Sequence, residues 1–310
     1  MKHKHLLGLE EYPAEDIQTI IDTAFSFREV LERPIKKVPS LQGKTIVNLF
    51  FENSTRTRIS FELAQKRLSA DTVNFSASMS SLKKGETFKD TAQNIEAMKI
   101  DAVVMRHPTP GAPLHLTKHI ESIVINAGDG THEHPTQAIL DMTSLQEKFG
   151  RLKGLKIGII GDITHSRVAL SNIYGLKTMG AEIALCGPAT LIPPFAEDLG
   201  VSVNYNVDEV IEWADAINVL RIQHERMGGG LLPSVREYRN LFGITTERLK
   251  MHKKEMVIMH PGPMNRGVEI DSAIADSDQA IILDQVLNGV ASRMAILYLL
   301  LGGKQEVGQN

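Results

Sequence analysis

The order of hydrophobic and polar residues divides the chain into runs that fit buried strands and stretches that fit helices. The first run, at 45–51, is almost continuously apolar, which is typical of a strand covered on both faces of a parallel sheet. It is followed by Phe61, Ala64 and Leu68, whose spacing predicts one face of a helix. The alternation continues with strands predicted at 72–75, 101–105 and 122–125 and a helix over 87–98.

A second series of strands and helices begins after residue 150. Pro135 opens a long helical stretch that Gly150 ends, because proline is tolerated in a first helical turn and glycine commonly follows a last one. Beyond it, strands are predicted at 155–160, 183–186, 201–205, 216–220 and 256–259, with helices between them. The predicted fold class is therefore α/β, with two doubly wound parallel-sheet domains joined by long helices.

The two series also predict where the domains begin and end. We expect a first domain over 1–150 and a second over 151–285. The last helix, at about 285–301, is strongly apolar, and we expect the segment 286–310 to pack back on the first domain. Ligands of open α/β sheets bind outside the carboxyl ends of the strands. The active site is therefore expected in the cleft between the two domains.

Composition and charge narrow the class of protein. The 310 residues are 42% hydrophobic and 23% charged, as in ordinary globular proteins, and 34 basic against 37 acidic residues give a net charge of −3. This balance argues against binding of nucleic acid or anionic membranes through overall charge. The N-terminus lacks the apolar core of a signal peptide, and the longest apolar stretch, 294–301, is too short to span a bilayer. Cys186 is the single cysteine and lies in an apolar run, so we expect a buried thiol in a soluble, cytoplasmic protein.

The segment 54–58, Ser-Thr-Arg-Thr-Arg, places hydroxyls and guanidiniums between the first strand and its helix. Ser54 stands where we expect it to cap that helix, and Thr55 opens it. The first-turn N–H groups, the positive end of the helix dipole and these side chains would converge on an anion, which predicts a phosphate site. The alternative is an ordinary capped helix with solvated arginines. The position directly after a buried strand favours the phosphate site.

Other cationic and polar side chains follow the remaining strands. They are Arg106 at the end of a strand, His134 and Gln137 at a helix start, and Arg167 and Arg221 in the second domain. Lys84, in the loop 80–86, fits either a solvated surface lysine or a side chain that reaches an anion from a mobile loop. No acidic cluster balances these cations, which predicts ligands with several negative charges.

Two further patterns give weaker indications. His132 and His134 suggest a metal, but a zinc site needs three or four ligands and no further His or Cys stands at ligand spacing. The segment 158–162 is similar to a dinucleotide loop but lacks the full G-x-G-x-x-G pattern. Paired carboxylates, a Ser-His-Asp order and an activated cysteine are all missing from the pattern, so covalent and glycosidic catalysis are poorly supported.

The ordered motifs together resemble those of the carbamoyltransferases, and most closely the members of that family that act on aspartate. They are S-T-R-T-R at 54–58, K-K-G-E at 83–86, M-R-H-P at 105–108, N-A-G-D-G at 126–130, H-P-T-Q at 134–137, R-x-Q at 221–223 and H-P-G-P at 260–263. The resemblance implies transfer of the carbamoyl group of carbamoyl phosphate to the amino group of L-aspartate. The products would be N-carbamoyl-L-aspartate and phosphate, as in de novo pyrimidine biosynthesis.

The resemblance also implies a role for each motif residue. Carbamoyl phosphate would be bound by Ser54, Thr55, Arg56, Thr57, Arg106, His134, Gln137, Gly262 and Pro263. Aspartate would be bound by Lys84, Arg167, Arg221 and Gln223, and the catalytic residues would be Thr57, Arg106, His134 and Lys84. Ser80 and Lys84 would enter the site from a neighbouring subunit of a homotrimer, and the Gly262–Pro263 bond would be cis. Neither a cofactor nor a metal is implied.

Several alternatives stay open at the level of sequence. One is a carbamoyltransferase for another amine, such as ornithine or acetylornithine, although the H-C-L-P motif of the ornithine enzymes is absent and the R-x-Q pair suits a dicarboxylate. A second is a non-catalytic module that binds phosphate or nucleic acid through 55–67, which the net charge of −3 disfavours. A regulatory chain or a dihydroorotase is a further candidate partner of the trimer.

Overall fold

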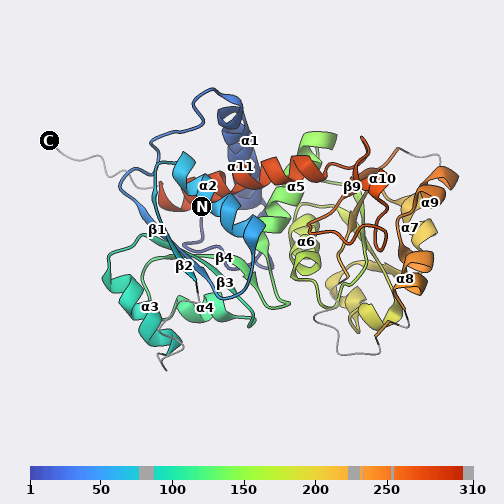
Figure 1. The fold of residues 1–310 in the computed structure, drawn as a ribbon, viewed down its shortest axis with the longest axis horizontal. Helices are drawn as coiled ribbons and strands as arrows, with labels where there is room; N and C mark the ends of the chain where they lie inside the picture. Colours follow the sequence, from blue (N-terminus) through green and yellow to red (C-terminus); the bar gives the residue numbers. More distant parts are fainter. Residues whose placement is uncertain (77–86, 223–230, 233, 253–254, 303–310) are drawn as a thin grey trace. The chain divides into compact units, whose positions relative to one another are not determined.

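The computed structural model describes residues 1–76, 87–222, 231–232, 234–252 and 255–302. The chain forms two compact units, one made of Met1–Thr143 and Leu287–Asn310 and the other of Ser144–Val286 (Figure 1). The chain leaves the first unit within helix α5, Pro135–Phe149, and returns to it within helix α11, Ile282–Leu301. Ser80, Lys84 and Gln223 lie outside the described residues.

The first unit is built on a four-stranded parallel sheet. Its strands are β1 (Thr45–Phe50), β2 (Asp71–Ser76), β3 (Ala102–His107) and β4 (Ile123–Asp129), in the order β2-β1-β3-β4. The four strands predicted in this half of the chain are confirmed. Because the chain moves outward from β1 in one direction and from β3 in the other, the switch point of the sheet lies between these two strands. Phe50 and Arg106 are paired across it.

Helices α1 (Ala14–Glu32), α2 (Thr55–Arg67), α3 (Phe88–Ala97) and α4 (Ala112–Leu116) complete the first unit together with α11. The helices expected after the first strand and over 87–98 are confirmed. Helix α3 begins with a capping box, in which Thr87 and Asp90 exchange hydrogen bonds between side chain and backbone. Helix α1 was not predicted, although its buried face follows the 3.6-residue period: Ile17, Ile20, Ile21, Ala24, Phe27 and Leu31.

The second unit contains a five-stranded parallel sheet of order β7-β6-β5-β8-β9. The strands are β5 (Lys156–Ile160), β6 (Glu182–Cys186), β7 (Ser202–Asn204), β8 (Ala216–Val219) and β9 (Val257–Met259), which confirms the second predicted series. The helices are α6 (Arg167–Thr178), α7 (Val207–Trp213), α8 (Val235–Phe242), α9 (Thr246–Met251) and α10 (Ser272–Ala275), with short 3-10 turns at Ala189–Leu191 and Ala196–Leu199. Here the switch point lies between β5 and β8.

Helices α5 and α11 lie against each other in the first unit. The hydroxyls of Thr143 and Ser292 are 3.2 Å apart, and Gly289 of α11 is so close to Leu140 of α5 that a Cβ atom there would stand 3.2 Å from the leucine side chain. Helix α11 begins three residues earlier than predicted, because the N–H of Gln285 already donates to the carbonyl of Ile281. Among the described residues, no helix is long and apolar enough to cross a membrane.

Candidate functional site

The first candidate element is the start of α2, directly after β1. Ser54 occupies the N-cap position and its carbonyl accepts from the N–H of Arg58 at 3.3 Å, as expected. Its hydroxyl forms no capping hydrogen bond, so the prediction of a side-chain cap is wrong. In α3 and α6, by contrast, the hydroxyls of Thr87 and Ser166 accept from the first turn. The Ser54 hydroxyl therefore does not accept a hydrogen bond from the first-turn N–H groups of α2.

Two side chains of the first turn of α2 are partly withdrawn from solvent. Thr57 is only 8% exposed. Arg56 is exposed, and desolvation of the part of its side chain that is covered lowers the pKa of its guanidinium. An arginine and a buried hydroxyl at a helix start are among the donors that bind phosphate in proteins.

Arg106 ends β3, the strand next to β1 across the switch point. Its Nε donates to Glu52 Oε1 at 2.6 Å, and one terminal nitrogen donates to the carbonyl of Ala127 at 3.2 Å. The side chains of Arg106 and Glu52 are 13% and 20% exposed. The prediction that no acid balances the strand-end cations is therefore wrong for Arg106. Glu52 stands on the neighbouring strand end two residues before Ser54, and this adjacency is visible only when the strand order is known.

His134 and Gln137 lie at the start of α5, in the segment that follows β4. Both are buried, with exposures of 4% and 9%. The Gln137 amide donates from Nε2 to Asp141 Oδ1 at 2.9 Å, one helical turn further along α5. Because a carboxylate accepts and an amide nitrogen donates, this bond turns the carbonyl oxygen of Gln137 away from Asp141. Asp141 is fully buried and was not identified from the sequence.

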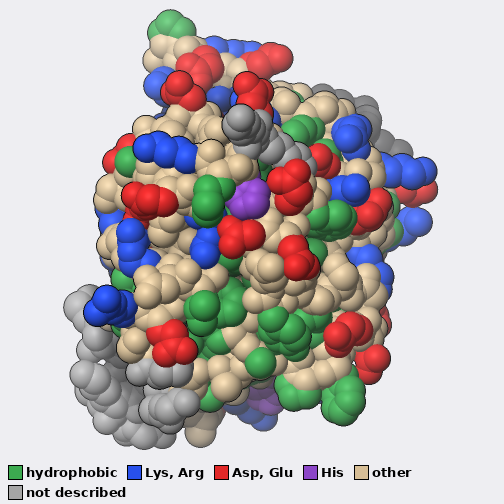
Figure 2. All heavy atoms as spheres, turned by 90° about the vertical axis from the view of Figure 1, so that its right-hand side faces the viewer, with side chains coloured by type: hydrophobic (Ala, Val, Ile, Leu, Met, Phe, Trp, Pro, Cys, Tyr) green, Lys and Arg blue, Asp and Glu red, His purple; other side chains and the backbone are tan. Residues whose placement is uncertain are grey.

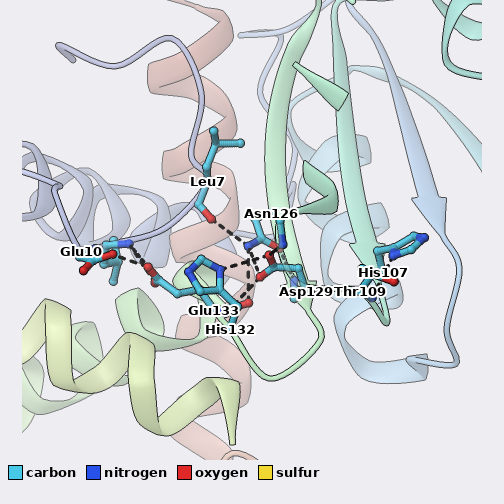
Figure 3. A network of polar contacts seen from close by, with 11 residues as sticks. Leu7, Glu10, His107, Thr109, Asn126, Asp129, His132 and Glu133 are labelled. Carbon is cyan, nitrogen blue, oxygen red and sulfur yellow. Dashed lines mark hydrogen bonds and ion pairs between the residues drawn. The ribbon is translucent and has the colours of Figure 1, made fainter. Parts of the chain in front are cut away.

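A buried polar network holds the turn between β4 and His134 (Figure 3). Asp129 accepts from the Asn126 side chain at 2.8 Å and from the backbone N–H of Glu133 at 3.0 Å. Glu133 in turn accepts from the N–H of Leu9 at 2.9 Å to each carboxylate oxygen. Asp129 and Glu133 are 2% and 1% exposed. The residue before His134 is thus tied both to the turn and to the N-terminal segment, which leaves that turn little freedom.

His132 belongs to this network and not to a metal site. Its Nδ1 lies 3.2 Å from Asp129 Oδ2, and this hydrogen bond raises the pKa of the imidazole. No group of three or more His, Cys, Asp or Glu side chains suited to a metal ion occurs among the residues that the structure describes. The metal interpretation of His132 and His134 finds no support in this geometry.

In the second unit, Arg167 and Arg221 follow the two strands at its switch point. Arg167 opens α6 after β5 and is 5% exposed, while Arg221 comes two residues after the end of β8 and is half-buried. Strands β5 and β8 are neighbours, so both arginines lie at the carboxyl edge of this sheet. Gly158, which suggested a nucleotide loop, lies inside β5, where a Cβ atom would meet Val210 of α7 at 2.7 Å. Close packing of a helix on the sheet accounts for that glycine.

The segment after β9 carries the last predicted residues. The Gly262–Pro263 peptide bond is cis, as predicted. His260 is buried, its N–H donates to Gln285 Oε1 at 3.0 Å, and its Nδ1 accepts from the N–H of Gly262 at 2.8 Å. These bonds fix the turn at the carboxyl end of β9.

The structure thus gathers the predicted residues into two groups. The group in the first unit comes from the ends of β1, β3 and β4: Ser54, Thr55, Arg56, Thr57, Arg106, His134 and Gln137. The group in the second unit is Arg167, Arg221, Gly262 and Pro263. Each group stands at the carboxyl edge of its own sheet, where ligands of such sheets bind.

Comparison with known proteins identifies the family. The profile described as "Aspartate/ornithine carbamoyltransferase, carbamoyl-P binding domain" matches residues 4–147, and "Aspartate/ornithine carbamoyltransferase, Asp/Orn binding domain" matches residues 153–300. The aspartate carbamoyltransferase catalytic subunit of Gemmatimonas aurantiaca is 61% identical over 304 residues, 98% of this chain and 95% of the relative. That of Christiangramia forsetii is 62% identical over 296 residues, 96% of each chain.

Solved structures agree. Aspartate transcarbamoylase from Trypanosoma cruzi in complex with carbamoyl phosphate superposes with a TM-score of 0.88 at 30% identity, covering 95% of this chain and 94% of that one. The catalytic subunit of M. Jannaschii aspartate transcarbamoylase gives a TM-score of 0.86 at 34% identity, covering 98% of this chain and 100% of that one. The two sheets, the ordered motifs and these matches lead to one conclusion: the chain belongs to the aspartate/ornithine carbamoyltransferase family.

Proposed function

We propose that this chain transfers the carbamoyl group of carbamoyl phosphate to the amino group of L-aspartate, giving N-carbamoyl-L-aspartate and phosphate. The observation that carries the proposal is the pairing of Arg106 with the end of β1, which sets a guanidinium beside the start of α2 at the switch point of the first sheet. Curated relatives at 56–62% identity are named aspartate carbamoyltransferase catalytic subunits, and a related structure holds carbamoyl phosphate and aspartate.

The phosphate group of carbamoyl phosphate is proposed to bind at the first turn of α2. The Ser54 hydroxyl is not engaged as a helix cap, so a phosphate oxygen can take the acceptor position that a cap would fill. Arg56, whose guanidinium pKa is lowered by partial desolvation, is proposed to bind the phosphate through its guanidinium. Ser54, Thr55, Arg56 and Thr57 together supply the hydrogen bonds.

The carbonyl oxygen of the carbamoyl group is proposed to face Thr57, Arg106 and His134. This oxygen gains negative charge as the amine attacks, so donors held around it lower the barrier most when they need no reorientation. Glu52 and the carbonyl of Ala127 hold the Arg106 guanidinium from two sides. The network of Asp129 and Glu133 does the same for the turn that leads to His134.

The amide nitrogen of the carbamoyl group is proposed to donate to Gln137. Asp141 binds Nε2 of Gln137, and the amide oxygen is therefore the atom available to accept. The backbone around Gly262 and Pro263 is proposed to contribute further acceptors. This arrangement distinguishes the amide end of the substrate from its carbonyl oxygen.

Aspartate is proposed to bind through its two carboxylates to Arg167 and Arg221, with Gln223 and Lys84 as further predicted contacts. Guanidiniums recognise carboxylates in bidentate geometry, and two of them suit a dicarboxylate better than the cationic side chain of ornithine. Figure 2 shows acidic and basic side chains interspersed over the face that it views.

The reaction needs little beyond placement and charge stabilisation. The amino nitrogen of aspartate attacks the carbonyl carbon, the bond from that carbon to the phosphate oxygen breaks, and the departing phosphate accepts the proton that the amine loses. Holding two anionic substrates in contact converts a bimolecular step into an effectively unimolecular one.

Three further properties stay predictions of the sequence. They are the homotrimer, with Ser80 and Lys84 entering the site from a neighbouring subunit, the cytoplasmic location, and association with a regulatory chain or a dihydroorotase.

One assay tests the proposal. Purified protein is supplied with carbamoyl phosphate and with aspartate, ornithine or acetylornithine in turn, and phosphate and the carbamoylated product are measured. We expect turnover with aspartate, reduced by about 10²–10³ in a folded Arg106→Ala variant, since one oxyanion donor is lost. Turnover with ornithine alone would reassign the acceptor. Absence of turnover with all three amines, together with intact phosphate binding, would favour the binding module.

A further inference from the structure

Arg293 is a fully buried cation on α11, on the side of α2 opposite to the solvent. It is 3% exposed and belongs to the same compact unit as the proposed phosphate site. One terminal nitrogen donates to the Ser60 hydroxyl of α2 at 3.0 Å and to the carbonyl of Gly289, one turn back on α11, at 2.9 Å. The guanidinium also lies over the ring of Phe61, 5.1 Å from its centroid. Arg293 is therefore attached directly to the helix whose first turn is proposed to bind phosphate.

The fold makes room for this guanidinium. A Cβ atom on Gly289 would stand 2.8 Å from a terminal nitrogen of Arg293 and 3.9 Å from the Ser60 hydroxyl. Glycine in the middle of a long helix costs about 0.5–1 kcal/mol relative to alanine. That cost is met here at a position where a side chain would collide with the buried arginine, so the glycine leaves room for the guanidinium.

The protein provides little negative charge to balance Arg293. Among the described residues, no carboxylate lies within ion-pair distance of it, and its Nε is buried without a hydrogen-bond partner. Asp141 is near enough to favour the charged form, but the charges of Arg106 and Arg56 disfavour it. Burial and these two arginines lower the pKa of Arg293 to about 9, so the side chain is still charged at neutral pH. A buried charge without a partner is expensive, because the lost hydration is not replaced.

The electrostatic coupling to Arg56 and Arg106 shows what could balance the charge. Both are proposed ligands of carbamoyl phosphate. Because their positive charges repel Arg293, a negative charge bound at the same place would attract it. A phosphate dianion between them would attract the very cation that they repel. Arg293 itself is buried, so at its position this attraction is screened less than it would be in water.

We infer that Arg293 is a positioning residue for the phosphate of the substrate: it holds α2 through Ser60 and acts as a buried positive charge whose counter-ion is the bound anion. The inference rests on the proposed function, because it takes the start of α2 as the phosphate site. It differs from a purely structural role in one respect. An arginine whose charge is balanced by protein groups stabilises the fold without ligand. An arginine whose counter-ion is the bound anion stabilises chiefly the protein with that anion bound.

Binding of inorganic phosphate by calorimetry and the melting temperature with and without phosphate test the inference. Arg293→Met removes the charge and roughly keeps the volume. We expect phosphate to bind it at least about tenfold more weakly, and we expect the melting temperature without phosphate to stay at or above that of the wild type. Arg293→Lys keeps the charge and should bind phosphate within about threefold of wild type. Arg28→Met is the matched control, since Arg28 also contacts α11, through Asn288, but is partly exposed; it should bind phosphate normally.

The outcomes separate the inference from the function on which it rests. If Arg293→Met melts lower but binds phosphate as the wild type does, the role is structural and the inference is wrong. If that variant does not fold, Arg293→Gln decides in the same way, and failure of both to fold also refutes the inference. If the wild type binds neither phosphate nor carbamoyl phosphate, and Arg56→Ala changes nothing, the proposed phosphate site itself is wrong.

Discussion

Replacing Glu52 with glutamine separates two effects that this carboxylate has on the proposed site. Glu52 accepts from Nε of Arg106 at 2.6 Å, and both side chains are largely buried, at 20% and 13% exposure. The bond orients the guanidinium, which should aid turnover. The same negative charge also weakens the positive potential at the site, which should hinder phosphate binding. Glutamine keeps the shape and an acceptor oxygen but removes the charge.

The two effects have opposite signs and different sizes. Hydrogen bonds to charged groups contribute about 1.5–3 kcal/mol, and each 1.4 kcal/mol is tenfold in rate, so we expect kcat to fall about 10- to 100-fold. Removing a negative charge from a partly screened site should tighten phosphate binding by about two- to tenfold. Lower turnover with tighter phosphate binding is a combination that general damage to the fold would not produce.

Steady-state kinetics with carbamoyl phosphate and aspartate, together with calorimetric titration of phosphate, measure both effects. Glu62→Gln is the control, because Glu62 forms an exposed i,i+4 pair with Lys66 at 2.7 Å on the same helix as the phosphate site. It should change neither kcat nor phosphate affinity by more than about twofold. A kcat of Glu52→Gln within twofold of the wild type would refute the orienting role. Weaker phosphate binding would refute the electrostatic argument.

Three further predictions follow from the site. Asp141→Ala should raise the KM for carbamoyl phosphate by about tenfold, because Gln137 loses the carboxylate that orients its amide, and an unchanged KM would contradict that orientation. His132→Ala should lower the free energy of unfolding by about 0.5–1 kcal/mol more at pH 5.5 than at pH 8.5, because the pKa of His132 is raised and its stabilising effect is lost as pH rises through that pKa. Chemical denaturation at both pH values measures this, and an equal loss at the two values would show that the pair with Asp129 is unimportant. Mixing inactive Lys84→Ala and Arg106→Ala chains should restore activity if sites are shared between subunits, and mixed trimers without activity would count against it.

The strands were the easiest part of the fold to predict. A strand of a parallel sheet is buried on both faces, so its sequence is a nearly continuous apolar run. The runs 45–51 and 155–160 are examples, and both form strands in the structure. Helix α1 was missed although Ile17, Ile20 and Ile21 mark its buried face. Helix α1 precedes the first strand, so the alternation of strands and helices does not predict it. Its omission was an error of interpretation, since the periodicity was present.

Partners of the functional side chains could not be predicted in the same way. Glu52 reaches Arg106 because β1 and β3 are neighbours in the sheet, although the two residues are 54 positions apart in the sequence and strand β2 lies between them in chain order. Glu133 binds the N–H of Leu9 only because the N-terminal segment pairs with β4 at Leu6 and Ile125. Such contacts depend on strand order and register, which hydrophobic patterns do not contain. Asp141 is the exception, since its distance of four residues from Gln137 on a predicted helix would have placed the two side chains together.

The distribution of acids explains why the sequence suggested an unbalanced set of cations. Acids are present, but each contacts one functional side chain or one turn: Glu52 binds Arg106, Asp141 binds Gln137, and Asp129 and Glu133 hold the turn before His134. A carboxylate placed in this way fixes the direction of one donor or the shape of one turn. Arg293 receives no such partner among the described residues, although its burial makes compensation most necessary there. On the inference made above, the bound phosphate supplies the missing counter-ion, so affinity for phosphate and tolerance of a buried Arg293 are two measures of the same charge.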